Sequence, residues 1–282
     1  MFIPFGFMAT PSGGGLPSEL ASYSVRLFND SYSGDCLRVR RSGDDAEQDI
    51  GFSAGVLDTA SMESFVTAGG GTQDGYVVTW FDQSGNGYDQ TQSTAGNQPQ
   101  IVSSGTTITQ GSYPAISFPG TTYLTRTHFI TNLADKTTFN VYYPTNIGTG
   151  DCIMDLDYCC PSTGRAWTLT SETALRCISR TYVTTAGSNN TYSLLEMWQN
   201  GITIDDASQF KMYLNGTYEA RTSGGDGDLV LAEGDAYIGF SPNGNNPFDG
   251  TQQEIVVYDS SLSDTDREAV RDSINTYYSI YP

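Results

Sequence analysis

From Tyr23 onward, the chain alternates apolar and polar residues over short stretches, the pattern of half-buried β-strands. "YSVRLF" (23–28) and "CLRVRR" (36–41) show the alternation, and "YVVTWF" (76–81) reads as a buried strand. Similar stretches, bounded by Gly, Asn, Asp or Ser turn residues, occupy 100–104, 106–110, 113–120, 137–143, 152–158, 165–170, 210–217, 228–234, 236–241 and 252–259. We predict a single all-β, two-sheet antiparallel sandwich of the jelly-roll type.

Two segments carry a helical pattern instead. Near 58–68, Asp58 can cap a short helix whose apolar face is Met62, Phe65 and Val66, and glycines 69–71 end it. Near 263–278, Ser263 precedes Asp266 by three residues, the spacing of a capping box. The residues expected along the apolar face of this second helix are Leu262, Ala269, Val270, Ile274 and Tyr277.

The chain divides into two parts. Residues 1–21 combine an apolar aromatic patch with a glycine-rich joint, and 22–282 form the sandwich without a break in composition. The first part is either a disordered terminus or an arm that docks onto a neighbouring subunit. The arm would use the apolar side chains Phe2, Ile3, Phe5 and Phe7.

Composition limits the partners. The formal net charge of −19 repels phosphate backbones, so we expect no nucleic-acid partner. No apolar run approaches the ~20 residues that span a bilayer. The start, "MFIPFGFMATPSGGGLP", lacks a basic region, so we predict no signal peptide.

Few residues suit a metal ion. The five cysteines and the single His128 match no common zinc site. Asp82, Asn86 and Asp89 surround the turn "DQSGNGYD" and are weak candidates for Ca²⁺. We favour the alternative, in which these side chains bond to their own backbone, and expect no cofactor.

The strings "TWFDQSGNGYDQTQ", "FKMYLNGT", "YIGFS" and "FDGTQQEIVVYDSSLSDTDREAVRDSINTYY" resemble the concanavalin A-like, laminin-G-like family over about 22–281. That resemblance implies two curved antiparallel sheets whose concave face handles carbohydrate. Chains of this kind are similar to fibre, decoration or adhesion components of bacteriophage particles.

A narrower resemblance links "RLFNDSYSGDCLRVRRSGDDAEQDIG", "WFDQSGNGYDQTQ" and the adjacent Cys159 and Cys160 to the catalytic domain of fungal B-type α-L-arabinofuranosidases. It implies that the cysteine pair forms a vicinal disulfide against a bound sugar. From the residues alone, two reduced thiols or a Cys152–Cys177 bridge remain open. The resemblance also implies a retaining mechanism with a glutamate nucleophile and an aspartate acid.

The catalytic pair of that family transfers only in part. The candidate nucleophile is Glu196 in "YSLLEMWQNG", and the position of the acid falls on Asn243 in "SPNGNNPFDG". An amide does not protonate a leaving group as a carboxylic acid does, so we expect a non-catalytic relative. The residues expected to contact a glycan are Cys159, Cys160, Tyr158, Trp167, Trp198 and Asn243.

These features lead to one expectation and one alternative. We expect a virion surface structural protein, on the virion surface or extracellular, that belongs to an oligomer. Its arm would bind other virion subunits, and its sandwich would bind cell-surface glycans. The alternative is a retaining glycoside hydrolase that resembles α-L-arabinofuranosidase.

Overall fold

The computed structural model describes residues 15–282 except 71, 133, 148–150, 157, 160–166, 172–173, 178–180, 184–188, 204–205, 207, 220, 224–229, 232–234 and 241–246. For 158–159, 167–171, 174–177, 181–183, 221–223 and 230–231, only the backbone is described. The expected arm residues Phe2, Ile3, Phe5 and Phe7 lie outside the described residues, so the arm stays a prediction. No helix in the described part of the chain is long and apolar enough to cross a membrane.

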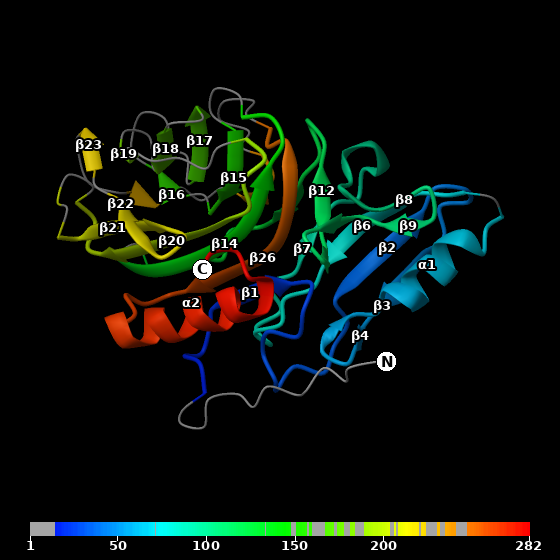
Figure 1. Ribbon diagram of the computed structural model, residues 1–282, viewed down its shortest axis with the longest axis horizontal. Coiled ribbons are helices and arrows are strands. Elements are labelled where there is room, and N and C mark those ends of the chain that lie inside the picture. The colour runs from blue at the N-terminus through cyan, green and yellow to red at the C-terminus, as the bar shows by residue number, and fades with distance from the viewer. Residues whose placement is uncertain are drawn as a thin grey trace.

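The first sheet is antiparallel and has β14 and β26 at its centre. Its order is β22 (Thr217–Glu219), β21 (Phe210–Leu214), β20 (Ser193–Asn200), β14 (Asp135–Pro144) and β26 (Gly250–Tyr258). Two short strands pair with different halves of β26, namely β1 (Ala21–Ser24) and β12 (Ile116–Phe118). The helix α2 (Asp264–Tyr278) lies along the face of this sheet that is turned away from β15, β17 and β18 (Figure 1).

The second sheet forms the other layer of the sandwich. Its order is β13 (Leu124–Arg126), β25 (Ala236–Ile238), β15 (Asp151–Asp155), β17 (Trp167–Ser171), β18 (Ala174–Cys177), β19 (Thr181–Val183) and β23 (Arg221–Ser223). Two further strands, β16 (Tyr158–Cys159) and β24 (Val230–Leu231), pair only with each other. In the chain, β16 directly follows β15 and β24 directly precedes β25. The predicted all-β two-sheet sandwich is confirmed.

An N-terminal module extends the sandwich at one end. It contains β2 (Leu37–Arg41), β3 (Glu47–Ile50), β6 (Gly75–Trp80), β8 (Gln100–Ser103), β9 (Thr106–Thr107) and the helix α1 (Thr59–Thr67). The strand β8 pairs with β6 and with β12, and so connects the module to the first sheet (Figure 1). The minor elements are β4 (Phe52–Ser53), β5 (Val56–Leu57), β7 (Gln90–Thr91), η1 (Ala95–Asn97), β10 (Thr109–Gln110) and β11 (Tyr113–Pro114).

Both helices begin where the sequence predicts. The Asp58 carboxylate accepts a hydrogen bond from the Ser61 backbone N–H at 3.0 Å, and α1 follows. The Ser263 hydroxyl accepts one from the Asp266 N–H at 3.2 Å and donates to the Asp266 carboxylate at 2.7 Å. The Ser263 cap, with Asp266 bonded back to its hydroxyl, therefore sets the start of α2.

The buried face of α2 confirms the prediction at Leu262, Val270 and Ile274 and differs from it at Ala269 and Arg267. Its buried residues are Arg267, Val270, Ile274 and Tyr278, whereas Ala269 is exposed. Arg267 lies in the buried stripe because the buried Glu196 of the sheet pairs with it, so the buried face of the helix is not purely apolar.

Candidate functional site

The outer face of the second sheet presents a cross-strand row of polar residues. Asp155 of β15 is paired with Tyr237 of β25, which is paired with Thr125 of β13. The next residues along these strands, Leu124 and Ile238, belong to the buried core. Since neighbouring residues of a strand point to opposite faces, the row lies on the side away from the core.

Three aromatic rings gather beside this row. The rings of Tyr123 and Phe240 are stacked, with centroids 5.2 Å apart and planes at 22°. Tyr237 lies 5.7 Å from Tyr123 and 6.2 Å from Phe240. We call Tyr123, Tyr237 and Phe240 the aromatic cluster. Rings of this kind offer the flat apolar surface on which sugar rings stack.

Gly239 brings Phe240 onto the cluster. It has a positive φ of 84°, and a Cβ at this position would lie 2.3 Å from the Phe118 ring. Its N–H donates to the Ile153 carbonyl at 3.0 Å, which holds the end of β25 against β15. Only glycine combines that backbone conformation with so close an approach to an aromatic ring.

Two carboxylates, those of Asp235 and Asp155, affect the pKa of Tyr237. Burial raises the pKa of Tyr237, and the negative charges of Asp235 and Asp155 raise it further, against a side-chain hydrogen bond from Thr125. Asp155 is only 2% exposed, whereas Asp235 is exposed. The face therefore combines aromatic rings, a neutral phenol, one enclosed carboxyl group and one open carboxylate.

Glu196 lies elsewhere. It is buried under α2, where its Oε1 accepts a hydrogen bond from Arg267 Nη1 and its Oε2 lies 3.2 Å from Arg271 Nε. Burial raises the pKa of the Glu196 carboxyl, and the charges of Arg271 and Arg267 oppose that rise. Glu196 therefore holds α2 to the first sheet through two arginines, and its expected role as a nucleophile stays a prediction.

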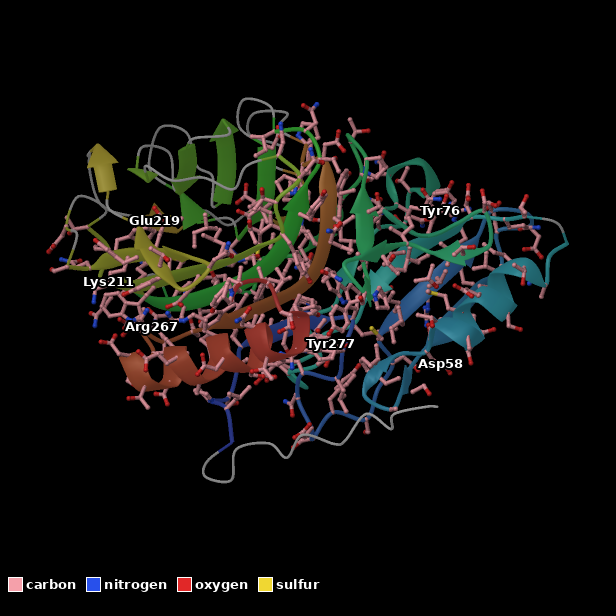
Figure 2. The ribbon with its side chains drawn as sticks, viewed as in Figure 1. Asp58, Tyr76, Lys211, Glu219, Arg267 and Tyr277 are labelled. Carbon is pink, nitrogen blue, oxygen red and sulfur yellow. The ribbon has the colours of Figure 1, made fainter. Side chains whose placement is uncertain are left out.

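Trp198 is also on the α2 side of the first sheet. Its Nε1 donates to the Leu262 carbonyl at 2.9 Å, and Lys211 Nζ lies 4.5 Å from its ring centroid. Arg267 lies over the same ring at 6.0 Å, and Figure 2 shows Lys211 and Arg267 at the same end of α2. Trp198 therefore packs the helix onto the sheet and is not part of the aromatic cluster.

The turn at Asp82 is held by its own hydrogen bonds. The Asp82 carboxylate accepts from the N–H groups of Ser22, Ser84 and Tyr88 at 2.9–3.0 Å and from the Ser84 hydroxyl at 2.6 Å. Asp89 accepts from the Asp82 N–H, and Asn86 donates to the Leu20 carbonyl. Within the described part of the chain, no group of three or more His, Cys, Asp or Glu residues could hold a metal ion.

The remaining predicted site residues lie outside what is described. The structure does not describe Cys160 and Asn243, and it describes only the backbone of Tyr158, Cys159 and Trp167. The chain nevertheless runs from Asp155 through three residues into Cys159. Sequence reasoning missed Asp155, Tyr237 and the aromatic cluster, because "YIGF" and "CIMD" do not alternate apolar and polar residues and so give no signal for this face.

Two family models match separate parts of the chain. Residues 144–266 match the concanavalin A-like lectin/glucanase superfamily, and residues 11–123 match the catalytic domain of α-L-arabinofuranosidase B. No curated protein sequence matches the chain.

Solved structures share the fold over most of the chain. An arabinofuranosidase complexed with arabinofuranosyl-α-1,2-xylobiose has a TM-score of 0.67 at 16% identity. A GH54 α-L-arabinofuranosidase soaked with a cyclic sulfate inhibitor has a TM-score of 0.63 at 15% identity. In both cases the match covers 92% of this chain and 63% of the other, so the chain spans less than two thirds of these proteins.

These findings correct the functional expectation. A virion surface structural protein is the wrong interpretation, because the family model and the solved structures point to arabinofuranosidase-like glycoside hydrolases, the alternative. The chain is an all-β two-sheet sandwich that resembles the concanavalin A-like superfamily over 144–266 and the arabinofuranosidase B catalytic domain over 11–123, and it shares the fold of solved arabinofuranosidases over 92% of its length.

Proposed function

We propose that the protein is a glycoside hydrolase acting on α-L-arabinofuranosides, with its site on the outer face of the second sheet. The observation that carries this is the pair of carboxylates, Asp155 and Asp235, beside Tyr237 and the aromatic cluster. The fold shared with arabinofuranosidases supports the choice of substrate.

The spacing of the two carboxylates suits glycoside hydrolysis. Asp155 is opposite Tyr237, and Asp235 lies two residues before Tyr237, just ahead of β25. If the strand alternation continues through Asp235, the two aspartates are diagonal neighbours on one face. Diagonal neighbours of antiparallel strands lie roughly 7–8 Å apart. Catalytic carboxyl pairs lie about 5–5.5 Å apart in retaining enzymes and about 6.5–9.5 Å apart in inverting ones.

The different exposures of the two aspartates suggest different roles. Asp155 is enclosed, and we assign to it the role of the carboxylic acid that donates a proton to the departing oxygen. Asp235 is open to solvent and serves as the charged partner on the other side of the scissile bond. The aromatic cluster holds the apolar face of the sugar and excludes water from part of it.

The test is turnover of 4-nitrophenyl α-L-arabinofuranoside by the full chain. We expect the wild type to release 4-nitrophenol and Asp155→Asn to lower kcat by about 10²- to 10⁴-fold, the usual contribution of a general acid. Asp49→Asn, which removes an exposed carboxylate paired with Arg38 on β2 and β3, is the matched control and should retain full activity. An inactive wild type, or an Asp155→Asn variant as active as the control, would show the proposal to be wrong.

A further inference from the structure

A cleft of about 470 Å³ opens on the N-terminal module, and neither Asp155 nor Asp235 lines it. Its walls come from β2, β6 and β8, from η1, and from the segment between β12 and β13. The residues that matter for a ligand are Arg40, Tyr76, Gln98, Gln100 and Thr122. Tyr76 lies in the module, far along the molecule from α2 (Figure 2).

The ring of Tyr76 gives the cleft a flat aromatic surface. The Arg40 guanidinium carbon lies 4.9 Å from the centroid of the Tyr76 ring, and Arg40 Nε in turn donates to Gln98 Oε1 at 2.7 Å. The Gln98 amide also donates to the Gln92 carbonyl at 2.9 Å. Because Arg40, which lies over one face of the Tyr76 ring, is itself held in this way, the ring loses little freedom when a ligand binds beside it.

The cleft also has a polar group left without a protein partner. Thr122 is 8% exposed, and its buried hydroxyl has no hydrogen-bond partner among the described residues. Gln100 uses its Nε2 to donate to the Val102 carbonyl at 3.0 Å. A hydroxyl-rich ligand would supply the partner that the Thr122 hydroxyl lacks, since a hydroxyl both donates and accepts.

The charges of the cleft favour a neutral ligand. The one cation, Arg40, is already paired with Asp45 at 2.6 Å and hydrogen bonded to Gln98. The chain as a whole carries a formal net charge of −19, which disfavours phosphate, sulfate or uronic acid groups. An aromatic plate with neutral amides and hydroxyls is the typical environment for a neutral sugar.

The cleft adjoins the aromatic cluster through one peptide segment. Thr122 is in the cleft, and the next residue, Tyr123, stacks on Phe240 in the cluster. The Tyr123 N–H donates to the carbonyl of Asn97 in η1 at 2.9 Å, and η1 also contributes Gly96 to the cleft. A polysaccharide lying over Tyr123 would therefore reach both places.

We infer that this cleft is a second glycan-binding subsite, which holds a neutral main-chain sugar of an arabinofuranosyl-substituted polysaccharide. The choice of polysaccharide rests on the proposed function, whereas binding at the cleft requires no catalysis. Tyr76 provides the stacking surface, and the hydroxyl of Thr122 bonds to the sugar.

The test is calorimetric titration of the full chain with arabinofuranosyl-α-1,2-xylobiose and with xylotetraose. We expect Tyr76→Ala to weaken the binding of both about tenfold and Thr122→Val to weaken it about threefold. Tyr218→Ala, which removes a 48%-exposed tyrosine on β22, is the control and should bind as the wild type does. Unfolding midpoints of the variants show whether each is folded, and Thr122→Val keeps the shape of the side chain in case Tyr76→Ala does not fold.

Turnover of the small aryl arabinofuranoside separates this inference from the proposed function. If the subsite exists, Tyr76→Ala leaves kcat/KM for the aryl substrate unchanged and raises KM for arabinoxylan. A wild type that binds neither oligosaccharide, or Tyr76→Ala and Thr122→Val variants that bind both as tightly as the control, would overturn the subsite whatever the catalytic result. Oligosaccharide binding that depends on Tyr76 in an inactive protein would support the subsite and leave only the hydrolase proposal wrong.

Discussion

At the scale of single residues, the surroundings of a buried carboxylate indicate whether its role is structural or catalytic. Glu196 and Asp155 are both nearly completely buried, at 1% and 2% exposure. Glu196 faces two arginines of α2, whereas Asp155 lies beside a tyrosine on the face that carries the aromatic cluster. The sequence around Glu196 gives no sign of this, because Arg267 and Arg271 are about seventy positions away.

The ion pairs of Glu196 predict an effect on stability. Glu196→Gln removes the buried charge partner that Arg267 and Arg271 of α2 share and leaves Arg267 paired only with the exposed Asp264. Breaking a buried pair in this way costs about 3–5 kcal/mol. We expect the free energy of unfolding in urea to fall by that amount and kcat of the folded protein to be retained. Asp49→Asn breaks the exposed pair with Arg38 and should cost less than about 1 kcal/mol. A stable Glu196→Gln protein without activity would contradict the structural role.

At the scale of elements, local signals predict where helices begin and leave their orientation open. Asp58 and Ser263 were identified from cap residues alone, and both accept the expected backbone hydrogen bonds. The predicted face of α2 is right at Val270 and Ile274 and wrong at Ala269. The buried Arg267 was not predicted, because periodicity does not show that the sheet carries a charged partner for it. The packing partner, not the propensity, decides which stripe of a helix is buried.

The cap of α2 predicts a modest and specific loss of stability. Ser263→Ala removes the acceptor for the Asp266 N–H and the reciprocal bond to its carboxylate, so the free energy of unfolding should fall by about 1 kcal/mol. Thr265→Ala, at an exposed position in the same first turn, is the control and should change it by less than about 0.5 kcal/mol. Equal effects of the two substitutions, measured by thermal or urea unfolding, would show that the cap contributes nothing.

At the scale of the whole molecule, the sequence is sufficient for the sandwich and insufficient for its site. Alternation in short strands predicts two sheets, since period-two patterns bury one face of each strand. Asp155, Tyr237 and Tyr123 come together only through the register of β13, β25 and β15. Strands from three distant stretches must pair correctly before that face exists, and a shift of one residue would turn every side chain to the other side.

The proposed hydrolase requires that the outer face of the second sheet binds the sugar. The most direct measurement is a crystal structure of the Asp155→Asn variant soaked with 4-nitrophenyl α-L-arabinofuranoside. We expect the arabinofuranose ring to contact Tyr237 or Phe240 within about 4 Å, with its glycosidic oxygen beside residue 155. A sugar bound on the α2 side of the first sheet, or an outer face that stays empty at saturating ligand, would contradict the account.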